Sequence, residues 1–250
     1  MFSKNSAKLI QSLQLKKNRL ALNLMVIEGE KLIIEAIQQR VEIKSIFILN
    51  DVYENHKSVF ENTNFTIVTA VQLQQISNLK NNNFGVATVV FNPKDLDYDL
   101  ILDKKVLILD DINDPGNLGT IIRTADWYGI KYIICSTDCV DYTNPKVIQS
   151  TMGSVFNVNI FYKDLNEVYD YLVKIPDFPI YASMLRGENF REVSTIKHGA
   201  LIMGSESHGI KTFPSNYTAI TIPKSRDAKA ESLNVATATA ILLSEFKRLT

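Results

Sequence analysis

The chain has 250 residues, enough for one large or two modest domains, and 46% of them are hydrophobic against 22% charged. This composition supports a buried core and excludes a largely disordered chain. The 27 basic and 27 acidic residues cancel, which argues against indiscriminate binding of nucleic acid but allows a local basic patch.

The first 20 residues are basic and contain no acid. Their lysines and arginine are Lys4, Lys8, Lys16, Lys17 and Arg19. These side chains form either a solvated helix face or a face that contacts phosphates. The segment is too polar for a signal peptide, and no apolar run in the chain reaches the ~20 residues that span a bilayer. We therefore expect a soluble, cytoplasmic protein without membrane contact.

The upstream part of the chain has the pattern of a small α/β domain. Residues 24–37 predict a short strand and then an amphipathic helix with Leu32, Ile33, Ala36 and Ile37 on one side. Further strands are predicted at 43–49, 65–70 and 85–91, and a helix at 70–79. An Asn-Pro pair and clustered acids then mark a linker. We therefore divide the chain into domains 1–95 and 103–250, joined by residues 96–102.

Strands and helices alternate in the downstream domain. Strands are predicted at 105–111, 132–137, 156–161, 179–184, 199–204 and 219–223, and helices at 118–129, 144–151, 165–174 and 233–249. The strands are almost continuously apolar, which is typical of a parallel sheet covered on both faces. Cys135 and Cys139 have no nearby histidine, which favours buried thiols over zinc. The histidines follow no metal-binding spacing, so we expect no metal.

A tight turn, NDPGNLG at 113–119, lies between the first strand of this domain and its helix. Ligands of open parallel sheets bind outside the carboxyl ends of strands, which is where this turn lies. The turn lacks the phosphate-loop and dinucleotide glycine patterns. Asn117 is placed to cap the helix. Arg123 lies one turn beyond Gly119, where it is either a surface residue that pairs with Asp126 or part of a functional site.

Two later strands end in similar turns. GSESHG at 204–209 follows one apolar strand, and the last strand ends at Pro223 before a loop that leads to Ser232 and a helix. Taken singly, Ser232 is a helix cap and the Ala/Thr-rich run after it is a close-packed helix. Together, the three strand ends describe a cleft with exposed backbone N–H and C=O groups.

These segments resemble the three motifs of the SpoU/TrmH family of RNA 2′-O-ribose methyltransferases, within the SPOUT superfamily. The matching residues are Asn113, Asn117, Gly119, Arg123 and Gly129 in the first motif, Gly204, Glu206 and Gly209 in the second, and Ile222, Pro223 and 232–235 in the third. Residues 17–37 are similar to the family's N-terminal RNA substrate-binding domain. The resemblance therefore covers nearly the whole chain.

The resemblance implies the reaction and its partners. It implies transfer of a methyl group from S-adenosylmethionine to a ribose 2′-hydroxyl of structured RNA. Ribosomal RNA is preferred, because the N-terminal domain resembles that of members directed to ribosomal RNA, and transfer RNA is the alternative. The resemblance also implies a trefoil knot in the C-terminal parallel-sheet domain, a small N-terminal α/β substrate-binding domain, and a homodimer with the active site at its interface.

The same resemblance implies the site residues. The cofactor is expected against Met203, Gly204, Gly209, Ile222 and Leu233, because apolar and backbone groups suit the largely neutral adenine and methionine. The catalytic candidates are Arg123, Asn117, Glu206, Ser232 and Asn234. Arg123 is either the base that takes the hydroxyl proton or a bidentate grip on the adjacent phosphate. Glu206 is the alternative base.

The sequence departs from the family pattern at two places. Ser207 replaces a usual glycine, and the loop KSRDAKAE at 224–231 is longer than usual and lacks a glycine. This loop predicts a differently shaped cofactor cleft with basic residues near RNA. Two other functions remain as alternatives: a non-catalytic RNA-binding module that keeps the fold, and a nucleotide-dependent oxidoreductase. The retained Arg123, Glu206 and Asn234 argue against the first, and the missing dinucleotide glycines against the second.

Overall fold

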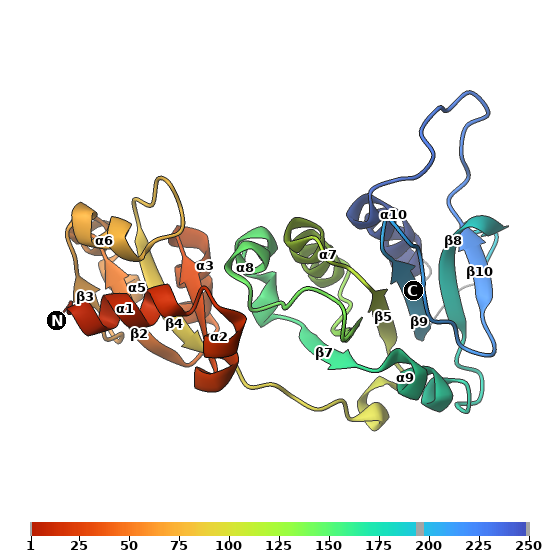
Figure 1. The fold of residues 1–250 in the computed structure, drawn as a ribbon, viewed down its shortest axis with the longest axis horizontal. Helices are drawn as coiled ribbons and strands as arrows, with labels where there is room; N and C mark the ends of the chain where they lie inside the picture. Colours follow the sequence, from red (N-terminus) through yellow and green to blue (C-terminus); the bar gives the residue numbers. More distant parts are fainter. Residues whose placement is uncertain (1, 194–197, 249–250) are drawn as a thin grey trace. The chain divides into compact units, whose positions relative to one another are not determined.

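The computed structural model describes residues 2–193 and 198–248, which pack as two compact units (Figure 1). Unit 1 comprises Met1–Pro93 and Asp141–Phe156, and unit 2 comprises Lys94–Val140 and Asn157–Thr250. Among the described residues, no helix has the length and apolar character needed to cross a membrane.

Unit 1 contains a mixed four-stranded sheet. Its strands are β1 (Leu24–Glu28), β2 (Ile43–Ile48), β3 (Thr66–Ile67) and β4 (Gly85–Val90), in the order β1-β4-β2-β3. Strand β4 is antiparallel to β1 and β2, and β3 is parallel to β2. The helices are α1 (Lys4–Ser12), α2 (Lys16–Leu22), α3 (Glu30–Gln38), α4 (Asn50–Asn55), α5 (Lys57–Phe60), α6 (Ala70–Ile76) and α8 (Pro145–Thr151). Leu32, Ile33 and Ala36 of α3 are buried, as their spacing predicts.

Arg19 has a structural role in unit 1. Its side chain is buried, and the guanidinium donates to Asp141 Oδ2 at 2.7 Å and to Thr143 Oγ1 at 2.9 Å. It also donates to the carbonyl oxygens of Leu13 and Gln14. A buried guanidinium is tolerated only when its charge and donors are satisfied in this way. Arg19 therefore does not belong to a phosphate-contacting face, whereas the four lysines of this segment are exposed.

Packing assigns two segments differently from the sequence pattern. Residues 141–156 lie in the middle of the downstream half but pack with unit 1, where Arg19 and β1 hold them. The predicted linker 96–102 is anchored in unit 2, because Leu96 and Ile101 are buried in its core and 98–101 form a 3-10 helix. Composition marks such a segment as a turn but cannot show which side chains it buries.

Unit 2 contains the predicted parallel sheet. Its strands are β5 (Lys105–Asp110), β6 (Tyr132–Ser136), β7 (Asn159–Lys163), β8 (Ile180–Asn189), β9 (Gly199–Gly204) and β10 (Thr218–Thr221), in the order β10-β8-β9-β5-β6-β7. Every neighbouring pair is parallel. Strands β6 and β7 lie on one side of β5, and the later strands lie on its other side in the order β9, β8, β10. The carboxyl ends of β5 and β9 therefore lie where open α/β sheets bind ligands.

Helices cover both faces of this sheet. The helix α9 (Leu165–Leu172) packs on the face that carries Val106, Ile108 and Ile134. Alternate residues such as Leu107 and Leu109 point to the opposite face. On that face α10 (Val235–Arg248) contacts β9 and packs against α7 (Pro115–Trp127). The α/β parallel-sheet prediction is confirmed, and the trefoil knot stays a prediction.

Candidate functional site

Helix α7 begins earlier than the sequence pattern predicts. The carboxylate of Asp114 caps it by accepting the backbone N–H of Asn117 at 2.8 Å. Pro115 occupies the first helical turn, where its missing N–H has no partner to lose. The prediction that Asn117 caps the helix is therefore wrong. Asn117 instead lies inside the first turn, and its side chain can reach another segment.

That other segment is the loop after β9. Glu206 Oε1 accepts hydrogen bonds from Asn117 Nδ2 at 3.2 Å, from Asn234 Nδ2 at 2.5 Å and from the backbone N–H of Val235 at 3.1 Å. Asn234 Nδ2 also donates to Asn117 Oδ1 at 2.9 Å. One side chain from each of the three sequence motifs thus meets the other two. The carboxylate of Glu206 also lies at the start of α10, where helix dipoles favour negative charge.

Asn234 is the N-cap of α10. Its Oδ1 accepts the backbone N–H groups of Ala236 at 3.0 Å and Thr237 at 3.2 Å. The sequence interpretation of Ser232 as the cap is therefore wrong. Ser232 instead lies on the wall of a neighbouring cleft.

This cleft has a volume of about 890 Å³ and opens at the carboxyl ends of β9 and β10. Its walls are formed by residues 183–186, by residues 203–210 and by part of the segment 221–235. All five predicted cofactor residues line it: Met203, Gly204, Gly209, Ile222 and Leu233. The walls combine apolar side chains with backbone groups of glycine-containing loops, and the volume suits a ligand of cofactor size.

Arg123 is exposed on α7 and lies outside the described lining of this cleft. Asp126, its predicted partner, binds Lys131 Nζ at 3.2 Å and Asn157 Nδ2 at 2.9 Å instead. Among the described residues, Arg123 forms no ion pair. Trp127, one turn further along the same helix, is 84% exposed. The surface alternative in which Arg123 pairs with Asp126 is therefore wrong.

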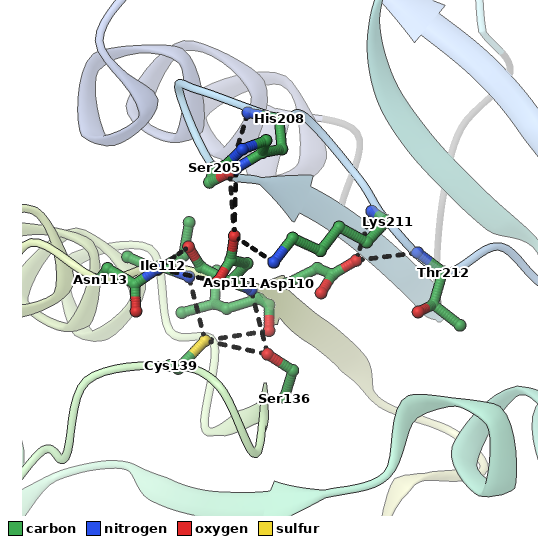
Figure 2. Close-up of polar contacts among 11 residues, drawn as sticks. Asp110, Asp111, Ile112, Asn113, Ser136, Cys139, Ser205, His208, Lys211 and Thr212 are labelled. Carbon is green, nitrogen blue, oxygen red and sulfur yellow. Dashed lines mark hydrogen bonds and ion pairs between the residues drawn. The ribbon is translucent and has the colours of Figure 1, made fainter.

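A group of polar residues that the sequence pattern did not reveal surrounds the end of β5 (Figure 2), and two of them, Ser205 and His208, line the cleft. Asp110 Oδ2, at the end of β5, accepts the backbone N–H groups of Lys211 at 2.7 Å and Thr212 at 3.0 Å. The next residue, Asp111, is buried and lies 2.7 Å from Lys211 Nζ. Two consecutive acids at the carboxyl end of an apolar strand were the available signal.

The two cysteines are buried and unbridged. Cys139 Sγ accepts the backbone N–H of Ile112 at 3.2 Å, so this thiol supports the turn between β5 and α7. A hydrogen bond with Cys139, together with burial, raises the pKa of the Cys135 thiol. Such a thiol is a poor nucleophile and behaves as a core residue.

Comparison with known proteins agrees with the motifs. The SpoU rRNA methylase family matches residues 104–244, and the MRM3-like substrate binding domain matches residues 4–87. The chain is 30% identical to the 23S rRNA (guanosine(2553)-2′-O)-methyltransferase RlmP of Bacillus subtilis, over 93% of this chain and 92% of that protein. The chain therefore belongs to the SpoU rRNA methylase family, as the resemblance predicted.

Solved structures share this fold. The AdoMet-bound rRNA methyltransferase from Sinorhizobium meliloti superimposes with a TM-score of 0.82 at 26% identity, over 99% of this chain and 96% of that one. The SpoU methyltransferase AviRb from Streptomyces viridochromogenes has a TM-score of 0.83 at 21% identity over 98% of both chains, which shows the shared fold.

Proposed function

We propose that this protein transfers the methyl group of S-adenosylmethionine to a ribose 2′-hydroxyl of ribosomal RNA. The observation that carries the proposal is the meeting of Asn117, Glu206 and Asn234 beside the cleft, because it joins all three motifs at one place. The relative from Bacillus subtilis is named for 2′-O-methylation of a guanosine in 23S rRNA. The protein is accordingly an RNA methyltransferase, and ribosomal RNA is its preferred substrate over transfer RNA.

The residues that line the cleft fit this cofactor. Met203, Ile222 and Leu233 offer apolar contacts, and Gly204 and Gly209 also line the cleft. S-adenosylmethionine supplies an activated methyl group when bound. The protein then has to exclude water, align the ribose hydroxyl and remove its proton.

Arg123 and Glu206 divide these tasks in our proposal. The exposed guanidinium of Arg123 either grips the phosphate next to the target ribose or acts as the base. Glu206 holds the beginnings of α7 and α10 together through its three hydrogen bonds. Asn117, Asn234 and Ser232 then orient the hydroxyl. Glu206 as the base is the lesser alternative.

We also propose a homodimer whose active site needs both copies. Arg123 lies outside the described lining of the cleft, so a second copy would have to bring its own Arg123 toward the bound cofactor. Trp127, 84% exposed on the same helix, is the kind of side chain that anchors protein interfaces. A cytoplasmic location fits the RNA substrate and the two free cysteines.

Trp127→Lys is expected to weaken dimerisation by roughly 30-fold or more, the range of an interface hot spot. Sedimentation equilibrium over a range of protein concentrations measures this effect. Val71→Lys is the matched control, because Val71 is 72% exposed but lies on α6 of unit 1. Equal dissociation constants for the two variants would contradict the assignment of α7 to the interface.

The four exposed lysines of α1 and α2 provide a test of RNA binding by unit 1. Replacing Lys4, Lys8, Lys16 and Lys17 by glutamine should flatten the dependence of log affinity on log salt by about 0.7–0.9 for each lysine that contacts a phosphate. Lys44→Gln with Lys57→Gln is the control, because these lysines pair with Glu42 and Glu54 at 2.6 Å. An unchanged slope would show that the four lysines form only a solvated surface.

The proposed reaction is tested with purified protein, radiolabelled S-adenosylmethionine and ribosomal RNA, followed by mapping of the methylated ribose. A labelled methyl group on the 2′-oxygen of one ribose is the expected result. Cofactor binding without methyl transfer to ribosomal or transfer RNA would favour the non-catalytic RNA-binding module. Failure to bind the cofactor would contradict the proposal.

A further inference from the structure

Asp111 combines two features that each cost stability. Its backbone has φ of 59°, the left-handed region that is unfavourable for residues with a side chain. Its carboxylate is buried, with the residue only 4% exposed, and a buried charge is costly unless it is paired. Residues kept in such a state are typical of functional sites, where the surrounding contacts determine their geometry.

The carboxylate faces the loop that follows β9 (Figure 2). Asp111 Oδ2 lies 2.7 Å from Lys211 Nζ, 3.5 Å from Ser205 Oγ and 3.5 Å from His208 Nδ1. Its other oxygen accepts a hydrogen bond from Asn113 Nδ2 at 2.8 Å. The hydrogen bond from Lys211 holds the pKa of Asp111 below its usual range, so the carboxylate is charged at neutral pH.

The same loop shapes the cleft. Residues 205–210 line it, and Glu206 reaches from the loop to Asn117 and Asn234. Mutual backbone hydrogen bonds between Ser205 and Gly209, of 2.9 and 3.0 Å, close the loop on itself. The loop is thus attached to the beginnings of α7 and α10 through Glu206, and to the end of β5 through Lys211.

We propose that Asp111 is a positioning residue, which fixes the loop 205–211 through Lys211 and Ser205 so that the loop forms one wall of the cofactor cleft and presents Glu206. The proposal rests on the function proposed for this cleft. It requires no contact between Asp111 and the cofactor or RNA. His208 adds a further charged contact only when its imidazole is protonated.

Two variants of Asp111 separate the carboxylate from the backbone. Asp111→Gly removes the carboxylate and suits the left-handed backbone, so it should fold without new strain. Asp111→Asn keeps the shape and removes the charge. Both should raise the dissociation constant for S-adenosylmethionine about tenfold or more, because charge-assisted bonds to the loop are lost. Since bound cofactor can itself order the loop, kcat at saturating cofactor should fall less than KM rises.

A double-mutant cycle tests whether Asp111 acts through Lys211. Asp111→Gly and Lys211→Met should have non-additive effects on cofactor affinity, because each removes the same ion pair. Lys104→Met is the matched control, since Lys104 pairs with the exposed Asp103 at 2.8 Å. Additive effects of the Asp111 and Lys211 variants would overturn the proposed connection.

Hydrogen exchange of residues 205–211 without cofactor gives a readout that does not depend on the reaction. Faster exchange in Asp111→Gly than in the Lys104→Met control is expected. Exchange and cofactor affinity equal to those of the unmodified protein would overturn the inference. If the unmodified protein itself fails to bind S-adenosylmethionine, the proposed function of the cleft fails, while the exchange rates still test the role of Asp111. If Asp111→Gly does not fold, Lys211→Met provides the same two readouts.

Discussion

Arg123→Ala is expected to lower the rate of methyl transfer about 100-fold or more, the usual effect of losing a group that aligns or deprotonates the nucleophile. The affinity for S-adenosylmethionine should stay almost unchanged, because Arg123 lies outside the described lining of the cleft. Stability should change little, since the side chain is exposed and forms no ion pair among the described residues. Single-turnover rates and calorimetry measure the two quantities separately.

Two companion variants sharpen this test. Arg123→Lys keeps the charge but loses the planar fork, so it should also be slow if the side chain grips a phosphate at two atoms. Lys131→Ala is the control, because Lys131 is a cation close in sequence that binds Asp126 and has no assigned role in the site. Near-normal turnover by Arg123→Ala would show that Arg123 acts neither as the base nor as the group that holds the phosphate.

The sequence predicted the sheet of unit 2 better than it predicted the helix beginnings. Apolar runs separated by helical periodicity specify parallel strands almost by themselves. Several neighbouring polar residues can cap a helix, and both motifs contain more than one such residue. Asp114 caps α7 and Asn234 caps α10, whereas Asn117 reaches Glu206 and Ser232 lies on the cleft wall. The Asp-Pro pair at the start of α7 is a local signal for the first cap, but the contact of Asn117 with Glu206 joins residues 89 positions apart and no local pattern contains it.

Burial of charge was the other feature that the sequence could not reveal. Arg19 belongs to a basic run, yet its partner Asp141 is more than 100 residues away, at a separation of 122. Asp111 reads as one of two strand-end acids, but its partner Lys211 comes from a loop beyond β9. In each case a charge pattern predicts solvent exposure, and a tertiary ion pair prevents it. The knot and the dimer are properties of chain path and assembly, and both stay predictions.

Gly204→Ala is expected to abolish detectable binding of S-adenosylmethionine. The reason is the close packing of the loop 205–211 against Gly204. A Cβ atom at Gly204 would lie 2.1 Å from the carbonyl carbon of Gly209 and 2.2 Å from the nitrogen of Ile210. Backbone atoms cannot accept so close a contact, so the loop 205–211 must move away from β9.

Moving the loop would disrupt both of its proposed functions. Residues 205–210 would no longer form their wall of the cleft, and Glu206 would lose its position against Asn117 and Asn234. Gly29→Ala is the control, because its Cβ would meet nothing within 4 Å, although its φ of 86° adds a backbone penalty in unit 1 that Gly204 does not have. Calorimetry should find normal cofactor affinity for Gly29→Ala and none for Gly204→Ala. Normal affinity in the Gly204 variant would mean that the cofactor binds elsewhere, since the loop cannot keep its present place once that methyl group is added.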